Sequence, residues 1–158
     1  MRRKDKEITD IDAKIAIIEK CKYCRLGIAL DNSPYVIPLN YGYTFENEKL
    51  SLFFHSANEG KKIDVLRNNN SACFEVDCDA QLVKGIKACN YGYAFKSIIG
   101  YGKITFLESN KEKADGLNQL MKHQTGETKE YTYSDNMLNK VCVLKMDVDE
   151  FKGKQCYV

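Results

Sequence analysis

The stretch over residues 53–64 brings together residue types that could bind an anion. Its sequence, FFHSANEGKKID, predicts the end of a strand, a turn of small residues and the start of a helix. The N–H groups in the first turn of a helix are unpaired and carry a partial positive charge, so cations are unfavourable there. Lys61 and Lys62 nevertheless fall in the opening turns. A bound anion would remove this conflict, and Gly60 would let it approach the backbone closely.

A second interpretation of the same stretch needs no anion. Ser56 and Glu59 have the spacing of a capping box, in which each side chain pairs with the backbone of the other residue. Two solvated lysines near the helix start would then cost only about a few tenths of a kcal/mol. The sequence leaves both interpretations open, because both use the same turn and the same helix.

The seven cysteines are a second group with chemical potential. Cys21 and Cys24 are spaced like half of a zinc site or like a redox dithiol. A zinc site needs a second ligand pair, and Cys73 with Cys78 or Cys89 is poorly spaced to supply one. We therefore expect Cys21 and Cys24 to be buried as small apolar side chains. The odd number of cysteines favours reduced thiols and a cytoplasmic protein.

Length and composition describe one ordinary folded domain over residues 1–158. Of these residues, 44% are hydrophobic and 29% are charged, as in globular proteins. The 24 basic and 22 acidic residues give a net charge of +2, which argues against a dedicated nucleic-acid-binding protein. The basic N-terminal start lacks the apolar segment of a signal peptide. No apolar run approaches the ~18 residues of a spanning helix, so we expect no membrane segment.

The hydrophobic pattern predicts short strands joined by tight turns, with a few helices between them. The expected helices cover residues 8–20, 56–67 and 110–123, the strands 24–30, 35–41, 50–55, 71–77, 96–107 and 141–148, and the turns 31–34 and 47–49, with 124–136 as loop or helix start. Pro38 should lie at a sheet edge or bulge, and Gly100 and Gly102 indicate bulges or close backbone approach. The order predicts a mainly β protein with flanking helices, built on an antiparallel barrel or sheet.

Several short motifs carry a resemblance to a known family: residues 35–42 (YVIPLNYG), 54–57 (FHSA), 60–62 (GKK), 24–27 (CRLG), 73–76 (CFEV) and the start MRRKD. In this order and spacing, the chain resembles the FMN-binding split β-barrel family related to pyridoxamine 5′-phosphate oxidase. Within that family it is most similar to the nitroimidazole-resistance (Nim) proteins. The resemblance covers most of the chain, from the first predicted helix to the last predicted strand.

The resemblance implies a six-stranded antiparallel split β-barrel that forms a homodimer, with FMN at the subunit interface. The residues that it implies for FMN are Val36, Ile37, Pro38, Leu39 and Asn40 at the ring, His55, Ser56 and Ala57 beside the ribityl chain and ring, Gly60, Lys61 and Lys62 at the phosphate, and Ser97 from the partner chain. The phosphate assignment agrees with the anion site inferred from the residues alone.

The activity that the resemblance implies is that of an FMN-dependent oxidoreductase. It would pass electrons from reduced flavin to a small planar acceptor such as a nitroaromatic, with NAD(P)H or another donor. Two alternatives are a non-enzymatic FMN-binding protein for storage or electron shuttling, and the same barrel with haem or no cofactor. An evident phosphate-binding set for vitamin B6 is lacking near the C-terminus, so oxidation of pyridoxamine phosphate is not expected.

Two polar residues, His55 and Arg25, have two interpretations each, and a third, His123, has one. His55 near a strand end is either a structural hydrogen-bonding residue or, beside a flavin, a group that transfers a proton during the reaction. Arg25 is either a flavin or interface contact or an inward strand residue paired with a carboxylate. His123 falls at the C-terminus of a predicted helix, where a cation is favourable, and we expect a structural role for it.

Overall fold

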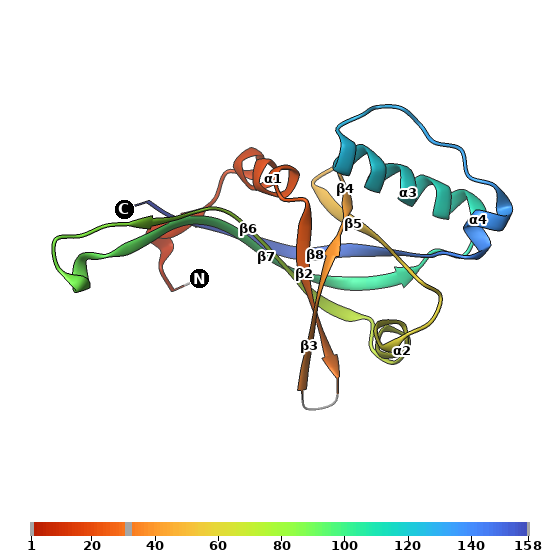
Figure 1. Cartoon of the computed structure of the whole chain (residues 1–158), viewed down its shortest axis with the longest axis horizontal. Coiled ribbons are helices and arrows are strands. Elements are labelled where there is room, and N and C mark those ends of the chain that lie inside the picture. Colours follow the sequence, from red (N-terminus) through yellow and green to blue (C-terminus); the bar gives the residue numbers. More distant parts are fainter. Residues whose placement is uncertain (1, 31–32, 158) are drawn as a thin grey trace.

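The computed structural model describes residues 2–30 and 33–157, and its main feature is an antiparallel sheet of eight strands (Figure 1). The strand order is β3-β2-β6-β7-β8-β5-β4, and the short β1 pairs with β8. Helices α1, α2 and α3 flank this sheet, so the prediction of a mainly β protein with flanking helices is confirmed. The sheet is consistent with a split barrel, but it has eight strands where six were expected.

The elements have the following bounds. The strands are β1 (Glu7–Ile8), β2 (Tyr23–Leu30), β3 (Ser33–Asn40), β4 (Gly42–Glu46), β5 (Lys49–Ser56), β6 (Ser71–Val83), β7 (Gly92–Phe106) and β8 (Cys142–Cys156). The helices are η1 (Lys4–Lys6), α1 (Ile11–Lys20), α2 (Lys61–Asn68), η2 (Ala88–Asn90), α3 (Asn110–Thr125) and α4 (Asp135–Asn139).

Most predicted elements appear at the expected positions, and three differences matter for the site. The helix expected from residue 56 begins only at Lys61, because β5 continues to Ser56 by pairing with β8. The sequence pattern does not predict β4 as a separate strand, and α4 begins within residues 124–136, where a loop or helix start is expected. Of the turn expected at 31–34, Asp31 and Asn32 lie outside the described residues.

The predictions for Pro38 and the glycines of β7 are confirmed. Pro38 lies on β3, which ends the sheet order and pairs with β2 alone among the described strands, and an edge strand is where a residue without an N–H is tolerated. A Cβ added at Gly102 would lie 2.1 Å from the carbonyl oxygen of Asp147, beside a shift in register between β7 and β8. Glycine is therefore required at position 102, where the backbones of β7 and β8 approach closely.

The hydrophobic core fills the space between the sheet and the helices, and His123 closes one end of it. Tyr41, Phe54 and Phe74 are fully buried there. The buried ring of His123 contacts the carbonyl oxygens of Tyr41 (2.7 Å from Nδ1) and Glu19 (3.0 Å from Nε2). The ring thereby joins α3 to α1 and to the β3–β4 connection, as expected for a structural histidine.

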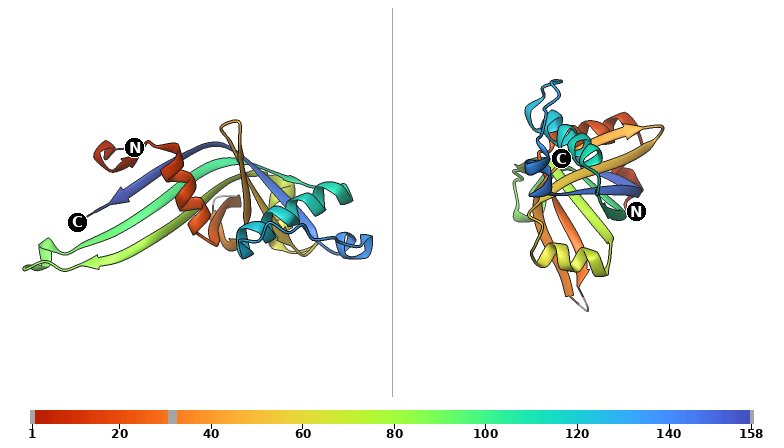
Figure 2. Two further views of the ribbon diagram at one scale, coloured as in Figure 1. Left: turned by 90° about the horizontal axis from the view of Figure 1, so that it is seen from above. Right: turned by 90° about the vertical axis from the view of Figure 1, so that its right-hand side faces the viewer.

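Strands β6 and β7 continue past the body of the molecule as a long hairpin, which we call the arm (residues 79–95; Figures 1 and 2). Beyond a shift in register between Cys78 and Gln81, the two strands stay paired as far as Val83 and Gly92. Strand β8 runs beside the base of the arm, because Cys156 pairs with Phe95. Among the described residues, no helix is long and apolar enough to cross a membrane.

Candidate functional site

The residues predicted to bind FMN within one chain lie on three neighbouring segments: the edge strand β3, the end of β5 with the turn after it, and the start of α2. The ammonium of Lys61 lies 4.8 Å from the centre of the Tyr35 ring, so the first residue of α2 contacts β3. The turn over residues 57–60 joins β5 directly to α2. The structure thus brings together two motifs that are about 20 residues apart in the sequence.

Strand β3 presents alternate residues to the core and to the outside. Ile37 and Leu39 are half-buried and pack against the core, whereas Val36, Pro38 and Asn40 are exposed on the outer face. Val36 is 58% exposed, which is high for a large apolar side chain. Because β3 is an edge strand, part of its backbone is also unpaired. Its outer face could therefore receive a flat apolar ligand with polar edges.

The end of β5 carries His55 and Ser56. His55 is exposed and lies opposite Val143 of β8, while the half-buried Ser56 lies opposite Cys142. Ala57, the next residue, is exposed in the turn toward α2. The position of His55 leaves its ring accessible to a ligand on the outside of the sheet.

The start of α2 has no side-chain cap. Gly60 is the N-cap residue, with φ 125° and ψ 164°, a conformation that is nearly restricted to glycine. The carbonyl of Gly60 accepts hydrogen bonds from the N–H groups of Ile63 and Asp64 at 2.8 and 3.1 Å. The interpretation of Ser56 and Glu59 as a capping box is wrong, because Ser56 ends β5 and no side chain caps this helix. The N–H groups of the first turn remain available to a ligand.

The two lysines at this helix start point to different sides. Lys61 is exposed and lies over Tyr35, whereas Lys62 is half-buried and lies near the thiol of Cys142. Burial lowers the pKa of Lys62, because it penalises the charged ammonium. Within residues 2–30 and 33–157, no ion pair involves either lysine. An anion at the helix start would compensate the charge of Lys62.

Ser97 lies apart from the other predicted residues. It is half-buried on β7, three strands away from β3 across the outer face of the sheet, which corresponds to about 14 Å. A hollow of about 490 Å³ is lined there by Ser97, Ile99, Tyr101 and Phe151, with charged residues of β8. A single chain therefore does not bring Ser97 to the β3–α2 segments.

The chain is similar to known proteins in both sequence and fold. The family model described as pyridoxamine 5′-phosphate oxidase matches residues 10–155. The chain belongs to this family. No curated protein matches its sequence.

Solved structures agree with membership of the pyridoxamine 5′-phosphate oxidase family. A candidate 5-nitroimidazole antibiotic resistance protein from Bacteroides thetaiotaomicron is 35% identical, with 94% of this chain and 86% of that chain covered and a TM-score of 0.81. The FAD- and haem-binding protein from Mycobacterium smegmatis is 13% identical, over 97% of this chain and 74% of that chain, with a TM-score of 0.84.

A third structure, a flavocytochrome from Azotobacter vinelandii, is 16% identical over 100% of this chain and 72% of that chain, with a TM-score of 0.81. At such identities, the second and third structures show a shared fold. The 35% identical protein confirms the resemblance to the nitroimidazole-resistance group.

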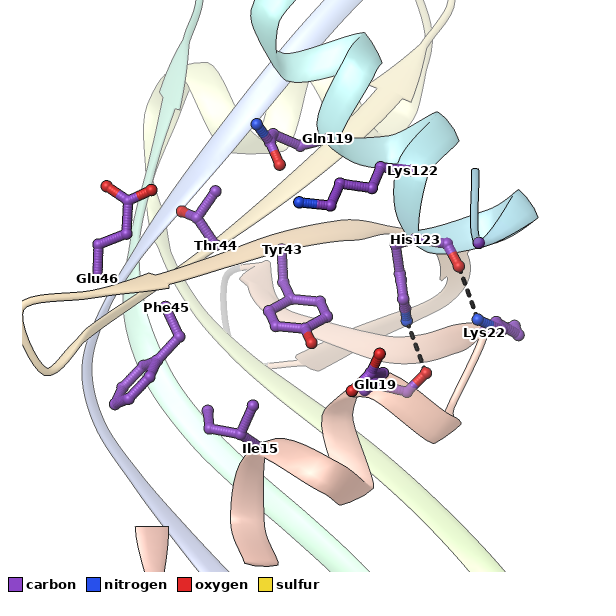
Figure 3. Close-up of a pocket in the computed structure, with 11 residues that line it drawn as sticks. Ile15, Glu19, Lys22, Tyr43, Thr44, Phe45, Glu46, Gln119, Lys122 and His123 are labelled. Atoms are coloured by element: carbon purple, nitrogen blue, oxygen red, sulfur yellow. Dashed lines mark hydrogen bonds between the residues drawn. The ribbon is translucent and has the colours of Figure 1, made fainter. Parts of the chain in front are cut away.

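This family member has a second hollow, of about 440 Å³, between α1, β4 and α3 (Figure 3). Its lining includes Glu19, Lys22, Glu46 and Lys122, and Figure 3 shows Lys122 directed toward Tyr43 and Thr44. None of the residues predicted for FMN lines this hollow. Sequence reasoning missed it, because its walls come from three elements that are far apart in the chain.

The prediction that Cys21 and Cys24 are buried thiols is confirmed, whereas Cys89 is exposed. All seven cysteines are free, and burial raises the pKa values of Cys21 and Cys24 to about 12, so neither is a reactive thiolate at neutral pH. Among the described residues, no group of three or more metal-ligating side chains is placed to hold an ion.

Arg25 points outward rather than inward. Its guanidinium pairs with the carboxylates of Glu75 (2.9 Å) and Asp77 (2.5 Å) on the neighbouring strand. The expected carboxylate partner is therefore present, but on the outer face of the sheet.

Proposed function

We propose that this protein binds FMN and acts, as a homodimer, as an oxidoreductase toward small planar acceptors such as nitroaromatics. The observation that carries the proposal is the uncapped start of α2 with two lysines, in contact with the exposed edge strand β3. The uncapped helix start can bind a phosphate, and the exposed edge strand can receive a flat ring with polar edges.

The residues present fit such a cofactor. The phosphate would be held by the N–H groups after Gly60 and by Lys61 and Lys62, where no carboxylate competes among the described ion pairs. The ring would lie on the exposed side of Val36 and Pro38. A bound flavin supplies the electron-transfer chemistry, and the chain binds it, orients it and limits access to it.

His55 is the residue that could hold or move a proton beside this site. It is exposed at the end of β5, on the chain segment that leads into α2. Two-electron reduction of an acceptor is accompanied by proton uptake, which an imidazole near neutral pH can supply. Replacing His55 by Ala should slow acceptor reduction while FMN stays bound. Equal rates for both proteins would assign His55 a structural role.

The dimer is supported by the outer face of the sheet. Tyr23, Val36, Ile99 and Tyr101 are between 43% and 58% exposed there, which is unusual for so many large apolar side chains on one face. A second copy related by a two-fold axis would cover them.

After the pairing of Arg25 with Glu75 and Asp77 and of Lys152 with Glu150, one side of β7 stays net acidic and the other net basic. Glu75 and Asp77 of β6 lie on one side of β7, and Lys152 and Lys154 of β8 lie on the other. A two-fold axis that runs along β7, between the two packed faces, would place the acidic side of one chain against the basic side of its partner.

Two relatives support a flavin. The FAD- and haem-binding protein and the flavocytochrome share this fold, and the 35% identical relative supports a nitro compound as acceptor. Their ligands differ, and the choice of FMN rests on the family resemblance, because the helix start of α2 suits the phosphate of FMN and the diphosphate of FAD alike.

Absorption spectroscopy of the purified protein tests the proposal. We expect flavin bands near ~370 and ~450 nm, bleached by NADH, NADPH or a chemical reductant and restored by a nitroaromatic acceptor. Light scattering should give a dimer of the 18.1 kDa chain. A colourless protein that binds no added FMN would refute the proposal, and a yellow protein that reduces no acceptor would indicate FMN storage.

A further inference from the structure

The hollow between α1, β4 and α3 has the size of a small-molecule site. Its volume is about 440 Å³, and protein sites for small ligands measure roughly 300–1,000 Å³. Its walls combine apolar surface from Ile15, Tyr43 and Phe45 with polar side chains from all three elements. None of the residues proposed to bind FMN lines it, so a ligand in this hollow would leave the start of α2 free.

Three of the four Asp, Glu, Lys or Arg side chains that line the hollow have no partner in the described chain. Figure 3 marks two hydrogen bonds between lining residues, one between Nε2 of His123 and the carbonyl oxygen of Glu19 (3.0 Å) and one from Lys22 to the carbonyl oxygen of His123 (2.6 Å). Both end on main-chain oxygens. Across residues 2–30 and 33–157, the carboxylates of Glu19 and Glu46 and the ammonium of Lys122 take part in no ion pair. These three charges are therefore available to a ligand.

The available charges have opposite signs and lie on different walls. Lys122 comes from α3 and Glu19 from α1, and the ring of Tyr43 lies between them (Figure 3). Burial and the nearby charge of Glu19 raise the pKa of Tyr43, so its hydroxyl stays protonated and can donate a hydrogen bond. The lining holds two acidic and two basic residues, whose formal charges cancel. This balance disfavours a ligand that carries charge of one sign only.

The three walls are fixed to one another before any ligand binds. The buried ring of His123 on α3 contacts the carbonyl oxygens of Glu19 on α1 and of Tyr41 just before β4. Helix α3 also lies directly on β4, because a Cβ added at Gly42 would be 2.3 Å from the backbone nitrogen of Leu120. A ligand therefore loses little affinity to the ordering of its site.

We propose that this hollow binds a small zwitterion with an apolar body, the chemical class of the apolar and aromatic amino acids. The ammonium of Lys122 binds the carboxylate of the ligand beside the hydroxyl of Thr44, and the carboxylate of Glu19 binds the ammonium group of the ligand. The apolar body packs on the ring of Tyr43. Such a ligand bridges two walls that the protein's own charged side chains leave unbridged, and its binding needs no flavin.

Titration calorimetry with amino acids and single-charge analogues tests the class of ligand. L-Phenylalanine is compared with 3-phenylpropionate, which lacks the ammonium group, and with 2-phenylethylamine, which lacks the carboxylate. L-Leucine is compared with its two corresponding analogues. At least one of the two amino acids should bind about tenfold or more tightly than either of its analogues, because each analogue loses one charge-assisted contact. If an analogue matches its amino acid in both series, or if neither amino acid binds at ~10 mM, the inference is overturned.

Two variants test the assigned contacts. Lys122→Gln should weaken binding of the amino acid about tenfold and leave the amine analogue unaffected, whereas Glu19→Gln should weaken it equally and leave the carboxylate analogue unaffected. Lys111→Gln, on α3 outside the hollow, is the matched control and should change neither affinity. All three replaced side chains are exposed, so the fold does not depend on them. A wild-type affinity in either hollow variant, or the same loss in the control, would overturn the assignment.

The hollow and the proposed flavin site can fail separately, because they share no residue. Saturation with the amino acid should leave FMN affinity within twofold of its value without it. If the protein binds no flavin, the proposed function fails, and the titrations with amino acids still test the hollow. Displacement of the bound amino acid by FMN would place the flavin in this hollow and overturn the inference.

Discussion

Helices α2 and α3 begin in opposite ways. At α3, the hydroxyl of Ser109 accepts a hydrogen bond from the N–H of Glu112 (3.2 Å), and the Glu112 carboxylate accepts one from the N–H of Ser109 (3.1 Å). At α2, the N-cap is Gly60, and no side chain caps the helix. The first turn of each helix carries one acidic residue, Glu112 in α3 and Asp64 in α2. Helix α2, however, starts with two adjacent lysines, whereas the acidic residue of α3 also closes the capping box.

The difference separates a structural helix start from one that is open to a ligand. The chain can build a complete capping box where a helix only has to fold, as α3 shows. At α2 it keeps a glycine in a conformation that other residues adopt only at a cost, and it places cations where the helix dipole disfavours them. A bound phosphate would offset both costs at α2. At α3 the N-cap residue is unstrained, and the carboxylate of Glu112 lies beside Lys111 in the first turn.

The largest effect is expected from Lys62→Ala. A charge-assisted hydrogen bond contributes ~1.5–3 kcal/mol, so its loss should weaken FMN binding by roughly ten- to a hundredfold. Isothermal titration calorimetry with FMN measures this change. Riboflavin has the same ring and no phosphate, so its affinity should be nearly equal for wild type and variant.

The chain offers a matched control for this variant. Lys111 is the second residue of α3, as Lys62 is the second residue of α2, and it is exposed beside the capping box. We expect Lys111→Ala to leave FMN affinity within twofold of wild type. If wild type binds FMN and riboflavin equally well, or if both lysine variants behave alike, the start of α2 does not bind phosphate.

A smaller effect, on folding rather than binding, is expected from Ser109→Ala. Loss of a serine N-cap destabilises a protein by ~1 kcal/mol, within a range of roughly 0.5–2 kcal/mol. Urea unfolding measures this loss of free energy, and FMN affinity should not change. The matched change Ser56→Ala removes no cap, because Ser56 belongs to β5, and should destabilise the protein less. Equal losses would contradict the assignment of the two helix starts.

The contrast between the two helix starts was only half visible in the sequence. The spacing of lysines and glycine indicated an anion site at residues 60–62, and the structure leaves that helix start open. The spacing of Ser56 and Glu59 was equally suggestive of a cap. What decides between them is the pairing of Ser56 with Cys142, a contact across 86 residues that no local pattern reveals.

The outer strands were harder to predict than the core for a similar reason. Alternation of apolar residues marked the buried parts of β6, β7 and β8, whereas the arm has no buried face to produce such a pattern. The positions of β3 and His55 followed from short motifs, but the distance of Ser97 from them follows from the strand order. Strand order depends on long-range pairing, and the sequence pattern does not encode it locally.

Lys61→Ala should weaken FMN binding by less than tenfold. Lys61 is exposed and already stabilised over the Tyr35 ring, so water and salt screen its interaction with a phosphate. Titrations at low and high salt should show a stronger salt dependence for the contribution of Lys61 than for that of the half-buried Lys62. An effect of Lys61→Ala larger than that of Lys62→Ala would reverse the order of the two lysines.

The smallest effect is expected from Glu112→Gln, and it depends on pH. The hydrogen bonds from Ser109 lower the pKa of Glu112, so the folded state favours the charged carboxylate. The resulting stabilisation is present above the ordinary glutamate pKa of ~4.3 and is lost as the pH falls through the lowered pKa of the folded state.

Glutamine at position 112 keeps the capping geometry and has no charge to titrate. Urea unfolding of both proteins at pH 7, 5 and 3 should therefore show wild type slightly more stable at pH 7 and 5, with the difference shrinking at pH 3. A constant difference at all three pH values would show that the charge of Glu112 does not stabilise α3, and the contrast with the lysines of α2 would then rest on hydrogen bonding alone.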